Sequence, residues 1–235
     1  MKAIFRTNDT IQVFRFDTTS NDKIEANKKR KIVQSYTFSR KQYELILNGT
    51  NEGMRMFFSS ADSNCLDCPF NEFGKCYTHK FNQYVGFVSM LKSIASEFGS
   101  FDNIPKFSRE IHRQIVKMSQ GTYVRFGTYG EPSVHPLQLI KDVIKVAVNH
   151  TGYTHQWDKK LELASVFMAS THDAVSEHVA RDKGFRSFIA TDQPIDGAVN
   201  CPASKEAGYK SHCSKCGLCS GAEGKGNKSV YILIH

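Results

Sequence analysis

Cysteine is the residue whose number and spacing point most directly to chemistry in this 235-residue sequence. The seven cysteines fall into a first group of three and a second group of four, in chain order Cys65, Cys68, Cys76, Cys201, Cys213, Cys216 and Cys219. An odd number argues against a complete disulfide framework, and the first residues of the chain lack the apolar core of a signal peptide. The clustering predicts metal sites in a reducing compartment, and we expect a cytoplasmic protein.

The first group has the spacing C-x2-C-x7-C and lies in one predicted loop. Three thiolates from one loop leave a coordination position open, which is the usual arrangement where a metal takes part in chemistry. A structural zinc site is the alternative. Cys76 and His79 are separated by two residues, as zinc ligands often are, and His79 would be the fourth ligand. An iron–sulfur cluster, zinc and unliganded thiols all stay open at this point.

The second group ends in a C-x2-C-x2-C triplet, the dense spacing of ferredoxin loops. Its remote member, Cys201, is followed by Pro202, as in ferredoxins, although here it precedes the triplet. Four thiolates complete the coordination of a cluster, so we expect a structural centre or an electron relay. Zinc held by four cysteines, or by three cysteines and His212, is the alternative.

A polar loop between a predicted strand and a predicted helix offers a ligand site. The strand covers residues 123–127, Gly130, Glu131 and Pro132 follow it, and the helix begins near Pro136. In α/β folds, loops at the carboxyl ends of strands bind ligands, whereas an ordinary connection is the alternative. His155 lies in a second polar and aromatic segment at a predicted strand end, and we expect it to contact a cofactor or substrate.

The elements that must position these residues alternate between strand and helix patterns. We expect an N-terminal extension over 1–50, with strands at 3–5 and 11–16, a charged loop at 18–31 and a short helix at 38–47. Further strands are expected at 54–59, 123–127, 153–157, 165–170, 185–190 and 229–234. Helices are expected at 79–98, 107–118, from 136 onward and at 173–183, the last with Asp173 at its N-terminus.

This alternation predicts an α/β fold with parallel strands. About six strands are too few for a closed eight-stranded barrel, so we expect a partial (β/α) barrel over 51–200. Residues 201–235 then form a cysteine-rich, metal-binding segment with the last strand. The sequence contains no G-x-G-x-x-G, Walker loop, G-x-S-x-G or H-E-x-x-H, so dinucleotide-binding, nucleotidase and ordinary hydrolase functions have no support.

The net charge of +8, from 31 Lys and Arg against 23 Asp and Glu, makes nucleic acid a possible partner. Part of that excess is the run at residues 28–31, which is more simply a solvated surface. No apolar run approaches the roughly 18 residues that a membrane helix requires, so no membrane partner is expected.

Two of these features together resemble the radical S-adenosylmethionine (SAM) superfamily. They are the cysteine triplet after a predicted strand and the Gly130-Glu131-Pro132 loop, which is similar to the family's "GGEP" segment. The resemblance covers about residues 54–220. The chain departs from the family pattern in two places. Its first cysteine group has the spacing C-x2-C-x7-C where the family has C-x3-C-x2-C, and Tyr129 replaces the first glycine of the segment.

The resemblance implies an enzyme that reductively cleaves SAM to act on an unknown substrate and that needs an electron donor. It implies a four-iron four-sulfur (4Fe-4S) cluster on Cys65, Cys68 and Cys76, with Gly130, Glu131 and Pro132 around SAM. The second group would hold an auxiliary cluster. The main alternative is a non-enzymatic zinc-binding protein that contacts nucleic acid.

Overall fold

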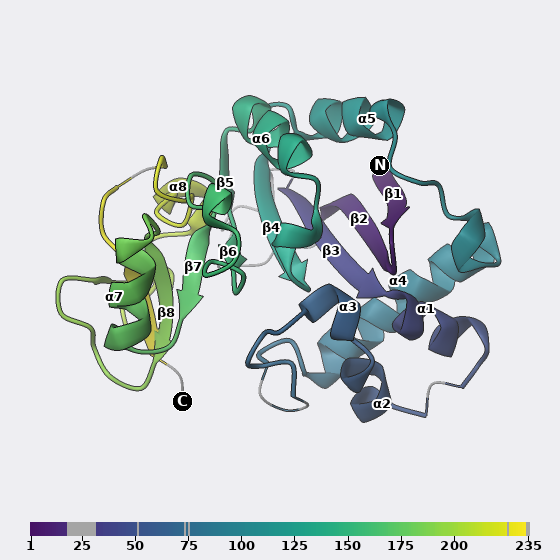
Figure 1. The fold of residues 1–235 in the computed structure, drawn as a ribbon, viewed down its shortest axis with the longest axis horizontal. Helices are drawn as coiled ribbons and strands as arrows, with labels where there is room; N and C mark the ends of the chain where they lie inside the picture. Colours follow the sequence, from purple (N-terminus) through teal and green to yellow (C-terminus); the bar gives the residue numbers. More distant parts are fainter. Residues whose placement is uncertain (18–31, 51, 73, 75, 225, 234–235) are drawn as a thin grey trace.

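The computed structural model describes residues 1–17, 32–50, 52–72, 74, 76–224 and 226–233, which form a mixed α/β fold with two five-stranded sheets (Figure 1). The first sheet contains, in spatial order, β1 (Lys2–Thr7), β2 (Thr10–Asp17), β3 (Ile32–Ser39), β4 (Tyr123–Tyr129) and β5 (Asn149–Thr151). The second contains β6 (Tyr153–Thr154), β7 (Met168–Thr171), β8 (Ser187–Thr191), β10 (Val230–Leu233) and β9 (Val199–Asn200). The expected loop at 18–31 lies outside the described residues.

Parallel pairing predominates from β3 onward. β1, β2 and β3 pair antiparallel, whereas β3 with β4 and β4 with β5 pair parallel. Every pair in the second sheet is parallel within the described residues. The chain passes between the sheets at Gly152, where a Cβ atom would lie 2.4 Å from the Phe167 ring, so only glycine fits. No closed barrel forms in the described residues.

The expected N-terminal extension lies inside the first sheet. β3 stands between β2 and β4, and all eight of its residues are buried. Its parallel neighbour is β4, the strand that leads to Glu131. A strand that is buried on both faces does not alternate between apolar and polar residues. The sequence pattern therefore does not reveal its position in the sheet.

The expected strand at 54–59 is wrong, because these residues form helix α2 (Met54–Ser59). Phe57 and Phe58 are fully buried and pack on Tyr84 and Tyr129. Short apolar runs satisfy either a buried strand or a buried helix, so periodicity alone does not distinguish them. The strand before the first cysteine group is therefore β3, followed by α1 (Arg40–Leu47), α2 and α3 (Asp62–Cys65).

The other expected helices are present, with every predicted end within two residues of the observed one. They are α4 (Phe81–Phe98), α5 (Arg109–Ser119), α6 (Leu137–Val146) and α7 (Ala174–Asp182), with the short α8 (Cys213–Cys216) added. Single 3-10 turns are η1 (Phe101–Asn103), η2 (Pro132–Val134) and η3 (Leu161–Leu163). Local signals explain this success: Ser39 and Asp173 each begin a helix with a capping box.

The core lies on both faces of the first sheet. Phe126 and its neighbours on one face pack against α5 and α6, and this cluster continues to Phe167 and α7. Tyr129 and its neighbours on the other face pack against α4. Figure 1 shows α5 and α6 above the sheet and α1 to α4 below it. Among the described helices, none is long and apolar enough to cross a membrane.

Candidate metal centres

The first cysteine group begins at the end of α3 and continues into the loop before α4. Backbone turns shape it: the Cys68 N–H donates to the Cys65 carbonyl at 3.2 Å, and the His79 N–H donates to the Cys76 carbonyl at 2.9 Å. Burial raises the pKa of the Cys65 thiol, and the neighbouring Cys68 and Cys76 raise it further. The three side chains therefore lie close enough to interact, and metal binding would have to displace their protons.

The Gly130-Glu131 loop lies directly against this group. The Glu131 N–H donates to the carbonyl oxygen of Asn64 at 2.7 Å, and Asn64 immediately precedes Cys65. Asn64 Nδ2 in turn donates to the Thr37 carbonyl at the end of β3, at 2.9 Å. Gly130 has φ of 77°, and a Cβ there would lie 1.9 Å from Thr37 Oγ1, so the loop can be this close only with glycine.

The Glu131 carboxylate is buried, at 3% exposure, and is held in place by hydrogen bonds. Its oxygens accept from the Ser133 N–H at 3.1 Å and the His155 N–H at 2.9 Å. Burial alone would raise the pKa of Glu131, but the His155 hydrogen bonds outweigh it and the pKa is lowered. Burial lowers the pKa of His155, yet Cys68 and Glu131 raise it to about 9. An imidazolium at His155 thus links the carboxylate to the first cysteine group.

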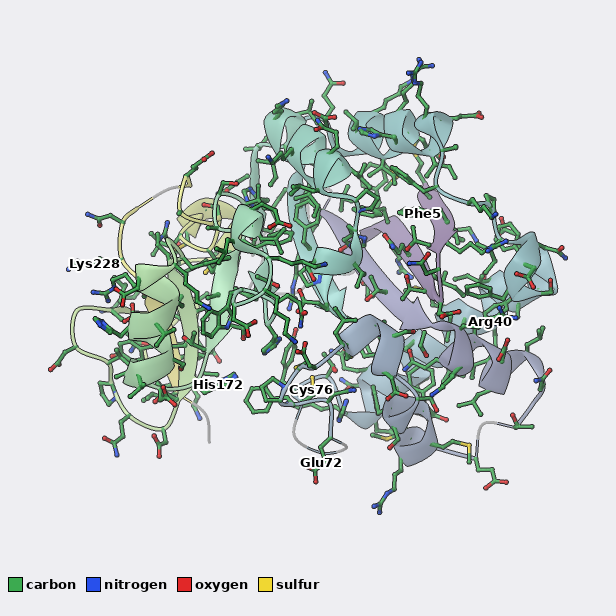
Figure 2. All side chains as sticks on the ribbon, viewed as in Figure 1. Phe5, Arg40, Glu72, Cys76, His172 and Lys228 are labelled. Carbon is green, nitrogen blue, oxygen red and sulfur yellow. The ribbon has the colours of Figure 1, made fainter. Side chains whose placement is uncertain are left out.

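Phe70, Asp67 and His172 lie around this group and were not predicted, unlike His155. The rings of His155 and His172 lie parallel, with centroids 5.9 Å apart, and the Phe70 ring meets both edge-on. Asp67, between two of the cysteines, accepts from Gln156 and Lys159. Figure 2 shows Cys76 and His172 at the lower edge of the two sheets. His172 directly follows β7, so its place at a strand end was the available signal.

Several buried polar atoms around the first cysteine group have no hydrogen-bond partner in the described part of the chain. They include His155 Nε2, His172 Nδ1, Thr171 Oγ1 and Asn64 Oδ1. Such atoms are costly unless a ligand or water satisfies them. His79, the alternative zinc ligand, accepts from the Gly74 N–H at Nδ1 and packs on Phe58. This hydrogen bond occupies one of its two ring nitrogens.

The second cysteine group converges on Cys219, which is buried. Burial raises the pKa of the Cys219 thiol far above its usual value, and Cys213, Cys201 and Cys216 raise it further. The short helix α8 carries two of these cysteines and ends at Gly217, which has φ of 68°. The Cys201 N–H donates to the carbonyl of Tyr231 in β10 at 2.8 Å, which joins the remote cysteine to the second sheet.

Arg186 holds the glycine-rich segment that surrounds the second group. Its buried guanidinium donates to four backbone carbonyls, those of Leu218, Gly221 at 3.0 Å, Gly226 at 2.8 Å and Lys228 at 3.2 Å. Burial lowers the pKa of Arg186 and Cys219 raises it. No sequence motif predicts that Arg186 makes these hydrogen bonds, because the acceptors are backbone atoms far along the chain.

The two groups lie at opposite ends of the parallel strands of the first sheet (Figure 1). Cys213 packs on Ile32 and Tyr123, the first residues of β3 and β4, and Gly217 lies against Asn149 at the start of β5. The first group lies instead where β3 and β4 end. The structure thus brings Glu131, Gly130 and His155 to the first group alone.

The donor set of each group suits a thiolate-bound metal. In the described residues, no three Cys, His, Asp or Glu side chains are close enough together to coordinate a metal ion. Metal binding would therefore require the thiols to move closer to one another. The first group combines three thiols with a buried carboxylate and unsatisfied polar atoms, which fits a cluster with an added organic ligand. No family model matches this chain, and no curated protein or solved structure matches it.

Proposed function

We propose that the protein is a radical SAM-like iron–sulfur enzyme that reductively cleaves SAM to act on a substrate still to be identified. The observation that supports this best is the meeting of Glu131 with the first cysteine group through the 2.7 Å hydrogen bond to Asn64. The carboxylate is buried beside this group, where Ser133 and His155 offset the cost of burying its charge and hold it in a fixed place. A bound cluster and SAM would supply the electron transfer and the radical chemistry.

The chain's own residues bind and orient these groups. Cys65, Cys68 and Cys76 would hold the cluster and leave one position open for SAM. The Glu131 carboxylate would face the ammonium of SAM, while Gly130 allows close backbone approach. Pro132 fixes the turn and opens η2, and His155 keeps the carboxylate in place.

The finer fold that we propose is the partial (β/α) barrel. Its strands would be β3, β4, β5 joined to β6 through Gly152, β7, β8 and β10. The parallel pairs on either side of Gly152 support this order. The first cysteine group and Glu131 would then lie at the carboxyl ends of the strands, where barrels bind their ligands.

We assign the second group to an auxiliary centre with all positions taken by Cys201, Cys213, Cys216 and Cys219. An iron–sulfur cluster there would store or relay an electron, and zinc would only stabilise the segment. The enzyme also requires an electron donor as a partner. A cytoplasmic location is part of the proposal, since a reducing compartment keeps thiols available for metal.

The test is iron content together with chromatographic detection of 5′-deoxyadenosine, using protein purified and reduced without oxygen. We expect the parent to release this product slowly from SAM. Cys68→Ala should abolish release and the first cluster but leave the second centre loaded. Glu131→Gln keeps the shape of the side chain, so iron should persist while SAM binds about tenfold more weakly, the usual loss for a charged hydrogen bond.

A zinc-binding protein that contacts nucleic acid is the second candidate, favoured by the net charge of +8. It predicts colourless protein with zinc in both groups. Its affinity for nucleic acid should fall steeply with salt, because bound phosphates release counterions. Parent protein that carries only zinc would replace the enzyme proposal with this one. Parent protein that holds an intact cluster without binding SAM would reject SAM cleavage but would not support zinc.

A further inference from the structure

Arg125 lies on β4 between the two cysteine groups. Its Nη2 donates to the hydroxyl of Tyr77 at 3.3 Å, and Tyr77 directly follows Cys76. Two residues back on the same face of β4, Tyr123 packs on Cys213. Arg125 as a residue is half-buried.

The Arg125 guanidinium has far more N–H donors than its described neighbours offer acceptors. Arginine presents five N–H groups, and the Tyr77 hydroxyl is the acceptor among the described side chains. The same described residues place no carboxylate within ion-pair distance of Arg125. Burial lowers the pKa of Arg125, but Tyr77, Tyr153 and Cys213 raise it, so the group stays charged. A partly desolvated cation without a counter-ion is costly, and an anionic ligand would offset that cost.

A second unsatisfied group lies beside the first. Tyr123 is 4% exposed, and in the described part of the chain its hydroxyl has no partner at good hydrogen-bond geometry, with Thr151 the nearest polar side chain that acts on it. Tyr123 and Arg125 are two residues apart on β4, so their side chains leave the same face of the strand. Tyr77 is 61% exposed, so the same place is open to solvent. A planar guanidinium with adjacent hydroxyl donors matches the geometry of a carboxylate or phosphate.

We propose that Arg125, with the hydroxyls of Tyr77 and Tyr123, binds an oxyanion of the substrate, either a carboxylate or a phosphate. This inference deepens the proposed function, on which it rests for the identity of the occupant as substrate. Anchoring the anion on β4 would place the rest of the molecule beside the first cysteine group. The competing role for Arg125 is to balance the charge of thiolates in the second group.

The experiment uses the full, metal-loaded chain, with inorganic phosphate and acetate as probes at constant ionic strength. Binding is followed by thermal shift in the parent, Arg125→Gln, Tyr123→Phe and Arg113→Gln, an exposed arginine of α5 that serves as the control. We expect Arg125→Gln to weaken binding of the preferred probe about tenfold or more, and Tyr123→Phe less. Arg113→Gln should match the parent, and all variants should keep their iron. The probe that binds more tightly identifies the class of anion.

Two results would overturn the site. One is equal probe binding in the parent and Arg125→Gln, and the other is loss of second-group metal in Arg125→Gln, which would assign the charge-balancing role. The outcome is separable from the proposed function. Probe binding through Arg125 without 5′-deoxyadenosine release leaves the oxyanion site and rejects SAM cleavage. Release of 5′-deoxyadenosine without probe binding supports SAM cleavage and rejects the oxyanion site.

Discussion

The two cysteine groups differ in what completes them. The first has three thiols, a buried carboxylate from another strand and polar atoms without partners nearby. The second has four thiols, one of them buried, inside a segment that Arg186 holds by hydrogen bonds to four carbonyls. One region leaves places for further ligands, whereas the other supplies its own. The difference teaches that similar cysteine counts within one chain can lie in surroundings with unsatisfied polar groups and in surroundings whose polar groups are satisfied.

The largest effect should separate the two regions by stability. Cys216→Ala opens a four-thiolate centre, and loss of a structural metal site is among the most destabilising changes known, so we expect a loss of about 4 kcal/mol or more. Cys68→Ala should cost clearly less, because the first loop lies on a sheet and helices packed without it. Thermal unfolding with metal analysis on both variants measures the contrast. Equal losses would show that both centres are structural.

Arg186→Met should come next, because it leaves four carbonyls without their donor. Unsatisfied buried acceptors cost about 1–3 kcal/mol each, and partial relaxation should limit the total to about 3 kcal/mol. If the proposed centres are present, metal in the second group should decrease while metal in the first group is unchanged. The control is Arg181→Met, since Arg181 pairs with Glu177 on α7 from a side chain that is 60% exposed. A result in which Arg181→Met destabilises as much would contradict a special role for Arg186.

Gly130→Ala should affect only the first region. A Cβ there meets Thr37 Oγ1 at 1.9 Å and Asn64 Nδ2 at 2.9 Å, in a backbone conformation with φ of 77°. We expect about 2–3 kcal/mol of destabilisation and weaker SAM binding, from the clash added to the backbone strain. Gly49→Ala is the matched control, with φ of 67° and nothing within 4 Å, and should cost only about 1 kcal/mol. Equal unfolding midpoints for the two variants would reject close packing of the Glu131 loop.

The effect that is smallest near neutral pH concerns the helix entry after the Glu131 loop, and it grows as the pH falls. His135 is buried between Gln12 at 2.6 Å and Ser35 at 2.9 Å, and burial lowers its pKa to about 3. The unfolded chain takes up this proton near pH 6.5, so it binds more protons than the folded chain below that pH. Stability should therefore decrease as pH falls from about 6.5 toward 3, by at most about 1.4 kcal/mol per pH unit from this group.

His135→Gln removes the titrating group and should flatten that slope when unfolding is followed by urea titration at several pH values. The variant will lose some stability at pH 7, but the slope and not the absolute value carries the test. His178→Gln is the control, because His178 is 72% exposed on α7. An unchanged slope in His135→Gln would assign the acid sensitivity to other groups.

Local chemistry can be predicted from short stretches of the chain. The helix starts at Ser39 and Asp173, the strand-loop-helix unit around Glu131 and the grouping of the cysteines all depend on neighbours a few residues apart. Capping bonds, turn residues and ligand spacing act over that range, so their patterns stay visible in the chain. The helix at Met54–Ser59 is the exception, because a run of six residues does not contain enough turns to show its period.

The sequence by itself determined how the cysteines are grouped and which loop offers a carboxylate. Only the tertiary structure decided that Glu131 meets the first cysteine group and not the second and that β3 lies next to β4. It also decided that Arg186 bonds the glycine-rich segment and that Arg125 bonds Tyr77. Strand order brings these residues together across long separations, and no local pattern encodes that order. The contacts depend on how two sheets bury their faces, which is a property of the whole chain.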